Sequence, residues 1–134
     1  MPSIDEIEGI TPKSATRLRK SGVKTAEGLL RRAATKKGRA ELAGATGFTP
    51  AEILAWVNRA DLMRVRGVGS EYGDLLEHAG VDTVKELRRR NATSLAAKMI
   101  EINEEKRLVR RLPTEGMIAS WIEQANELEP LVKH

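Results

Sequence analysis

The chain repeats itself, and this duplication constrains the fold more than any other feature of the sequence. A shift of 58 residues places Gly9 on Gly67, and a shift of 65 places Trp56 on Trp121, so the second copy holds about seven extra residues. The first shift also aligns Ile10 with Val68, Leu18 with Leu76, Gly22 with Gly80, Val23 with Val81 and Thr25 with Thr83. We expect two pseudo-repeats, residues 1–62 and 63–134, packed as one compact unit, with equivalent packed tryptophans and a frayed C-terminal tail.

Composition indicates that these repeats are helical. Aromatic residues make up 3% of the chain and alternating β-branched runs are almost absent, so little is available to build strands. Helix starts are marked by Thr11 before Pro12 and by capping boxes at Thr49–Glu52 and Thr83–Glu86. The sequence therefore predicts an all-α fold with about five short helices in each repeat.

Catalytic groups are sparse. The absence of cysteine excludes disulfides, cysteine-based zinc sites and thiol nucleophiles, and neither His78 nor His134 has an equivalent in the other copy. No glycine-rich loop ends in the lysine of a P-loop. We predict that the protein is not an enzyme and has no cofactor. Short, interrupted apolar runs predict a cytoplasmic protein that does not enter a membrane.

The positive charge is concentrated in the first half of the chain. Residues 1–64 carry a net charge of +5 and residues 65–134 carry −1. This asymmetry favours a polyanion as partner. Three further basic runs, Arg31–Arg39, Arg88–Arg90 and Lys106–Arg111, are typical of solvated helix faces and ends.

Each repeat also contains a glycine-bearing turn before a helix, in "IEGITPK" (Ile7–Lys13) and "VRGVGSEY" (Val65–Tyr72). Glycine permits left-handed backbone angles and close approach, while backbone N–H groups at a helix start form a site suited to phosphate. The alternative is that the glycines only let helices cross closely. Trp56, Trp121 and Tyr72 are expected to pack in the core rather than stack on bases.

These turns resemble the helix-hairpin-helix motif. The whole chain is similar to stand-alone prokaryotic proteins with tandem units of this kind, a family described as a domain of unknown function, through "IEGITPK", "AGVDT" and "WVNRADLMRVRGVG". It is more distantly similar to the C-terminal helical domain of the bacterial RNA polymerase alpha subunit. The resemblance implies a helix-hairpin-helix (SAM/HhH-like) fold, turn contacts with DNA phosphates, and a possible monovalent cation held by the Gly67–Gly69 turn.

The two copies match the motif unevenly. In the first turn, Thr11 stands in place of the second glycine of the motif. The charges differ as well: basic residues follow the first turn, whereas Glu71 and Asp74 follow the second turn, which has both glycines. We therefore consider three functions. The first is non-specific binding of double-stranded DNA, which would associate the protein with the nucleoid. The second is a protein-protein interaction module that keeps the fold without binding DNA, and the third is an enzyme accessory domain that acts beside a nuclease or polymerase. The candidate DNA-binding residues are Gly9, Ile10, Thr11, Lys13, Arg17 and Lys20 in the first repeat, and Arg66, Gly67, Val68, Gly69 and Ser70 in the second.

Overall fold

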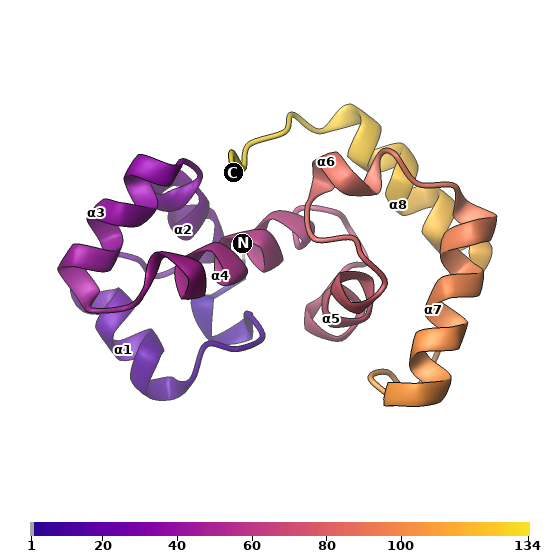
Figure 1. Ribbon diagram of the computed structural model, residues 1–134, viewed down its shortest axis with the longest axis horizontal. Helices are drawn as coiled ribbons and strands as arrows, with labels where there is room; N and C mark the ends of the chain where they lie inside the picture. Colours follow the sequence, from indigo (N-terminus) through magenta and orange to yellow (C-terminus); the bar gives the residue numbers. More distant parts are fainter. Residues whose placement is uncertain (1) are drawn as a thin grey trace. The chain divides into compact units, whose positions relative to one another are not determined.

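The computed structural model describes residues 2–134 and is all-helical there, which confirms the predicted class (Figure 1). The chain divides into two units, one running to Asp61 and including Leu131–His134, the other Leu62–Pro130. The elements are the 3-10 helix η1 (Ile4–Glu6) and the α-helices α1 (Pro12–Lys20), α2 (Ala26–Ala33), α3 (Lys36–Thr46), α4 (Pro50–Leu62), α5 (Ser70–His78), α6 (Val84–Leu87), α7 (Ala92–Lys106) and α8 (Glu115–Glu127).

The prediction of about five helices per repeat is correct for the first repeat and wrong for the second. The segment equivalent to η1 in the second repeat is Leu62–Arg64; it consists of the last residue of α4 and the turn after it, and forms no helix of its own. The chain therefore passes from the end of α4 to the second turn without a separate short helix. The described residues consequently contain four separate helices after α4 rather than five.

Equivalent positions make the same backbone hydrogen bonds in both repeats. The amide of Val23 donates to the carbonyl of Leu18 at 2.9 Å, and the amide of Val81 donates to Leu76 at 2.8 Å. Thr25 caps α2 as Thr83 caps α6. The sequence match at a shift of 58 residues thus corresponds to a shared local geometry.

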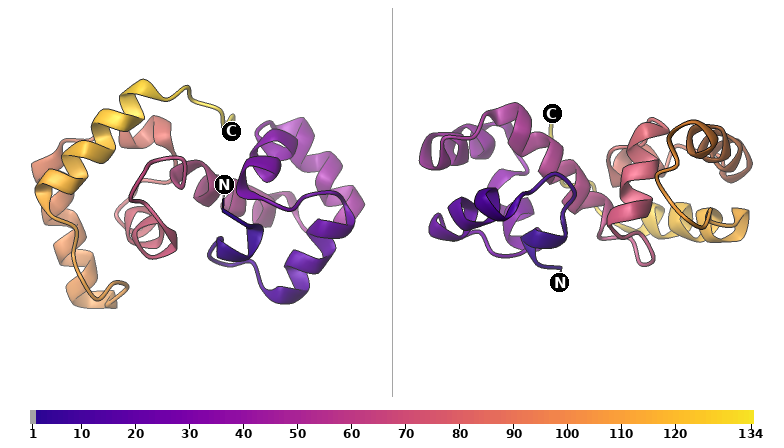
Figure 2. Two further views of the ribbon diagram at one scale, coloured as in Figure 1. Left: turned by 180° about the vertical axis from the view of Figure 1, so that it is seen from behind. Right: turned by 90° about the horizontal axis from the view of Figure 1, so that it is seen from below.

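Each unit has its own apolar core. Leu18, Leu29, Leu42 and Ile53 are fully buried in the first unit. The core of the second unit contains Leu75, Leu76, Leu87, Met99 and Ile118. Figure 2 shows α7 and α8 side by side. Full burial of such side chains contributes about 1.5–3 kcal/mol each.

The two tryptophans occupy equivalent packed positions, as predicted. Trp56 is 6% exposed and Trp121 is 2% exposed. The ring of Phe48 meets Trp56 edge-on with centroids 4.9 Å apart, and the ring of Tyr72 lies 5.3 Å from that of Trp121. Trp56 and Trp121 are therefore packed in the core, and Tyr72 packs against Trp121 while half-buried.

The expectation of a frayed C-terminal tail is wrong. Val132 is buried, and the amide of Lys133 donates to the carbonyl of Ala34 at 2.8 Å. Arg39, itself buried, donates from Nη2 to the carbonyl of Lys133 at 2.6 Å and from Nη1 to Ala33 and Ala34. A guanidinium with several donors fixed in one plane can join the end of α2 to the tail in this way.

Candidate nucleic-acid interface

The glycine at the apex of each turn is required by the fold. Gly9 and Gly67 have φ of +94° and +93°, in the left-handed region that disfavours other residues. A Cβ built on Gly9 would lie 3.4 Å from Nε1 of Trp56, and one on Gly67 would lie 3.0 Å from Nε1 of Trp121. Backbone conformation and indole packing therefore account for these two glycines without a ligand.

Gly69 is different, because nothing in the fold requires a glycine there. Its φ is −100°, which any residue adopts, and a Cβ at this position would meet no atom within 4 Å. The residue is exposed and immediately precedes α5. An exposed glycine that neither strain nor crowding demands leaves room for close approach of another molecule to the backbone.

The start of α5 is also exceptional among the helices of residues 2–134. No side chain caps it, whereas a threonine or asparagine side chain accepts a backbone N–H at the start of every other α-helix. Those capping residues are Thr11, Thr25, Thr35, Thr49, Thr83, Asn91 and Thr114. The first amides of a helix have no partner inside the helix, and an anion placed there also meets the positive end of the helix dipole.

At the first turn, the start of α1 offers fewer uncapped backbone N–H groups than the start of α5. The hydroxyl oxygen of Thr11 accepts from the amide of Ser14 at 3.1 Å, and the two hydroxyls lie 3.0 Å apart. Pro12 occupies the first helical position and has no N–H to offer. Two of the features that make a helix start attractive to phosphate are therefore missing from α1.

The apolar residues of both turns point into the protein. Ile10 is 8% exposed and Val68 is 4% exposed. Their amides donate to the carbonyls of Ile7 and Val65 at 3.2 and 3.1 Å. Ile10 and Val68 thus shape the turns and leave the glycines and the residues after them at the surface.

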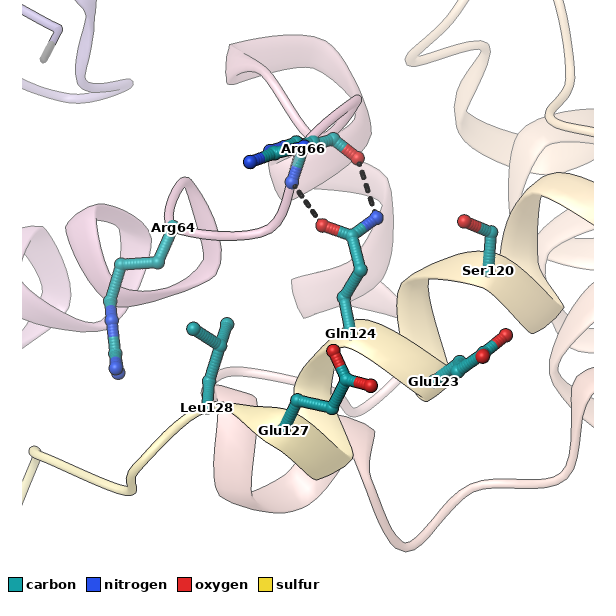
Figure 3. A pocket seen from close by; sticks show the side chains of 7 residues that line it. All are labelled: Arg64, Arg66, Ser120, Glu123, Gln124, Glu127 and Leu128. Atoms are coloured by element: carbon teal, nitrogen blue, oxygen red, sulfur yellow. Dashed lines mark hydrogen bonds between the residues drawn. The ribbon is translucent and has the colours of Figure 1, made fainter.

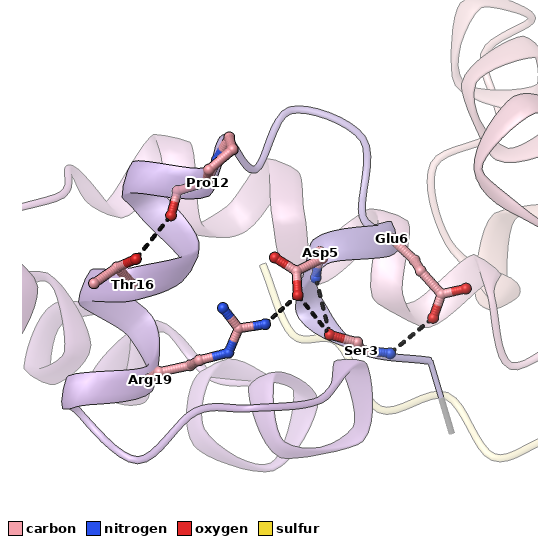
Figure 4. A network of polar contacts seen from close by, with 6 residues as sticks. All are labelled: Ser3, Asp5, Glu6, Pro12, Thr16 and Arg19. Carbon is pink, nitrogen blue, oxygen red and sulfur yellow. Dashed lines mark hydrogen bonds and ion pairs between the residues drawn. The ribbon is translucent and has the colours of Figure 1, made fainter.

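Two of the cations that follow the first turn are engaged within the protein. Arg19 forms an ion pair with Asp5 of η1, in a network that includes the Ser3 hydroxyl (Figure 4). The hydrogen bond from Arg19, followed by that from Ser3, lowers the pKa of the Asp5 carboxyl. Arg17 lies 5.4 Å from the centroid of the Phe48 ring and donates to a backbone carbonyl. Both arginines hold α1 against its neighbours.

Three of the predicted cations remain available. Lys13 and Lys20 are exposed on α1, seven residues apart and therefore on one face of the helix. Arg66, directly before Gly67, is also exposed. Within residues 2–134 these three side chains form no hydrogen bond or ion pair, so they can meet an external anion without breaking an internal contact.

Gln124 holds the second turn in place and could not be identified from sequence. The amide of Arg66 donates to Oε1 of Gln124 at 2.9 Å, and Nε2 of Gln124 donates to the carbonyl of Arg66 at 3.2 Å (Figure 3). A pocket of about 680 Å³ opens beside this pair and is lined by Arg64, Arg66, Ser120, Glu123, Gln124, Glu127 and Leu128. The paired amide fixes the backbone on which the Arg66 side chain and Gly67 are mounted.

Acidic side chains accompany this turn. Glu71 is exposed in the first turn of α5, where it favours the helix dipole but opposes a second anion. Asp74 lies one turn farther along α5, and its carboxylate oxygen is 3.5 Å from the Nδ1 atom of His78. Among the described residues, no three His, Asp or Glu side chains are grouped so as to hold a metal ion.

Taken together, the geometry defines an all-α protein with two related glycine turns, of which the second presents an open helix start. Residues 8–128 match the family described as Domain of unknown function (DUF4332). The chain belongs to this family, as the resemblance in its sequence indicated. No curated protein and no solved structure matches the chain. None of the helices in the described part of the chain has the length and apolar character needed to cross a membrane.

Proposed function

We propose that the protein binds double-stranded DNA without strong sequence preference, through repeats of the helix-hairpin-helix type. The second repeat provides the main phosphate contact, at the backbone of Gly69 and Ser70 with Arg66 beside it. Lys13 and Lys20 add charge from the first repeat. Phosphate contacts of this kind position a protein on nucleic acid and carry no sequence information of their own.

The observation that carries this proposal is that the fold does not require a glycine at position 69. Gly9 and Gly67 have structural reasons to be glycine, whereas Gly69 has an ordinary φ and open space around its missing Cβ. It also stands before the one α-helix of residues 2–134 that lacks a side-chain cap. A glycine that the fold does not need, placed at a helix start, lets a phosphate approach the backbone closely.

A protein-protein interaction module is the second candidate, and specific contacts favour it. Arg17 and Arg19 are engaged inside the first unit, and Glu71 places a negative charge next to the open turn. These features weaken a general attraction to DNA. In this alternative the family fold is kept and the turn serves packing only. A monovalent cation at the Gly67–Gly69 turn stays a prediction in either case.

The test is a salt titration of binding to a short mixed-sequence duplex and to each of its single strands. We expect the parent protein to bind the duplex at low salt, with log affinity falling linearly against log salt concentration. Gly69→Val places a branched side chain over the turn, and the open space at Gly69 leaves the fold intact. The variant is therefore expected to remain folded and to bind the duplex more weakly.

A second pair of variants tests the contribution of the first repeat. Lys13→Glu with Lys20→Glu is expected to weaken binding at low salt more than Arg88→Glu with Arg89→Glu, which makes the same change in charge. Equal effects would show that net charge alone governs the interaction. No measurable duplex affinity in the parent, or an unchanged affinity in folded Gly69→Val, would instead support the interaction module.

A further inference from the structure

We propose that the connection between α7 and α8, residues Arg107–Pro113, is a second contact surface for the nucleic-acid backbone. We name it the arginine loop. This inference rests on the function proposed above and adds a surface to it. It also explains how a repeat with a complete glycine turn but an acidic α5 can attract a phosphate backbone.

The arginine loop is the main structural consequence of the extra residues in the second repeat. α3 has 11 residues and a short connection, residues 47–49, leads from it to α4. The equivalent helix α7 has 15 residues, and the arginine loop joins it to α8. The first repeat therefore has no counterpart of this surface, and a comparison of the two copies by sequence does not reveal what the insertion does.

The loop has a fixed path that leaves its arginines outside. Asn103 of α7 accepts from the amide of Val109 at 3.0 Å and donates from Nδ2 to the carbonyl of Val109 at 3.2 Å. Val109 is itself buried against the core of the second unit. The side chains of Arg107, Arg110 and Arg111 are exposed. Anchoring at a buried residue reduces the entropy that the loop would lose on binding.

Tyr72 connects the loop to the glycine turn. Its hydroxyl group donates to the carbonyl of Arg111 at 3.0 Å, and its place in the first turn of α5 is three residues after Gly69. The Tyr72 ring contacts Trp121, whose Nε1 lies against Gly67. A short chain of contacts thus places the arginine loop beside the turn, although the two segments are far apart in the sequence.

The backbone at Arg107 is a further indication of function. Arg107 ends α7 with φ of +50°, the one positive φ of a non-glycine residue in the described chain. The equivalent position at the end of α3 is Gly47, with φ of +85° and the same hydrogen bond to the residue four earlier. An L-residue other than glycine is disfavoured in this conformation. The second repeat therefore retains a cation where the backbone favours glycine.

The positive charges of the arginine loop are not paired with acidic side chains of the described residues. No guanidinium of Arg107, Arg110 or Arg111 forms an ion pair within residues 2–134. Residues 65–134 as a whole carry −1, and three of their eleven basic side chains lie in this loop. Guanidinium groups bind phosphate in a bidentate manner, and Tyr72, in the first turn of α5, is hydrogen-bonded to the backbone of the loop. A phosphate backbone fits both features at once.

Two double variants test the inference with equal changes in charge. Arg110→Gln with Arg111→Gln removes two cations from the arginine loop, and Arg88→Gln with Arg89→Gln removes two that follow α6. Figure 1 shows that the chain enters α7 from α6 at one end and leaves it through the arginine loop at the other, so a helix about 22 Å long separates the control charges from the loop. The measurement is the affinity of each folded protein for a short duplex over a range of salt concentrations.

We expect the loop variant to bind the duplex more weakly. The negative slope of its log affinity against log salt should be less steep by about 1.8, since each phosphate contact accounts for about 0.9. The control variant should change the slope much less. Equal slopes for the two variants, in a protein whose binding is weakened by Gly69→Val, would overturn the inference and leave the proposed function standing. A weakened loop variant beside an unaffected Gly69→Val would support the loop and reject the turn. Binding of the same proteins to poly-glutamate is measured in parallel, as a probe for an acidic protein partner. A loop variant that loses poly-glutamate binding but keeps duplex binding would assign the loop to such a partner and overturn the inference.

Discussion

Gly69→Thr should make the protein more stable and a weaker DNA binder at the same time. The substitution copies the first repeat, where Thr11 stands at the equivalent position and its oxygen accepts from the amide three residues later. The open space at Gly69 and its φ of −100° admit the threonine without steric cost. Its hydroxyl would then accept from the amide of Tyr72, at the helix start where we place the phosphate.

The magnitudes follow from these two effects. Threonine is better than glycine as a helix cap by a few tenths of a kcal/mol, and loss of glycine's freedom in the unfolded chain adds about 0.4–1 kcal/mol. The free energy of unfolding should therefore rise by about 0.6–1.4 kcal/mol. A hydrogen bond to a charged group is worth about 1.5–3 kcal/mol, so loss of one phosphate contact should weaken binding roughly 10- to 150-fold.

The assay combines urea denaturation, followed by tryptophan fluorescence and circular dichroism, with the salt titration of duplex binding. Gly44→Ala is a matched control, because Gly44 lies in α3, is exposed and would have no atom within 4 Å of an added Cβ. It should stabilise by a similar amount, about 0.8–1 kcal/mol, without changing affinity. The reasoning is refuted if Gly69→Thr destabilises the protein or if it leaves affinity and salt slope unchanged in a protein that binds DNA.

Three further predictions concern the fold. Gly67→Ala should lower the free energy of unfolding by about 1–2 kcal/mol or more, and Gly9→Ala by less, since the added Cβ is closer to the indole at Gly67; equal stability losses in urea denaturation would contradict this order. Asp5→Asn should flatten the acid limb of the stability curve, because a lowered pKa stabilises above the ordinary value of 3.8 and that contribution disappears as pH falls through the folded-state pKa; an unchanged acid limb would argue against the Arg19 pair. Arg39→Met should speed amide hydrogen exchange at Lys133, and unchanged exchange would show that the tail is held without the guanidinium.

Local features of the sequence predicted where several α-helices start, although not the number of helices in the second repeat. Thr11 and Thr49 each cap a helix where the sequence places one, because capping depends only on residues a few positions away. The capping box expected at Thr83–Glu86 is half formed. The threonine oxygen accepts from the amide of Glu86, but the carboxylate of Glu86 pairs with Arg90 at 3.0 Å.

The supporting contacts of the site could not be predicted in this way. Gln124 pairs with the backbone of Arg66 across 58 residues of sequence, and Tyr72 reaches Arg111 across 39. Such contacts depend on how helices pack, and periodicity or caps carry no information about them. From the sequence, the basic run Lys106–Arg111 is expected to be a solvated helix end. Its position relative to the second glycine turn depends on tertiary contacts, which local sequence patterns do not encode.

The same limit applies to the cations of the first repeat. The sequence places Arg17 and Arg19 beside Lys13 and Lys20 as one basic group after the turn. The structure separates them, since Arg19 pairs with Asp5 and Arg17 packs on Phe48. Only tertiary contacts decide which charges are available to a partner.

The most direct test of the central claim is to map, by NMR, the backbone amides of the ¹⁵N-labelled protein that shift when a short duplex is added at low salt. We predict that the largest changes occur at Gly69, Ser70 and Glu71, with smaller ones at Arg66, and that raising the salt concentration reverses them. Shifts confined to other helices, or no shifts at concentrations that saturate binding, would contradict a phosphate contact at the second turn.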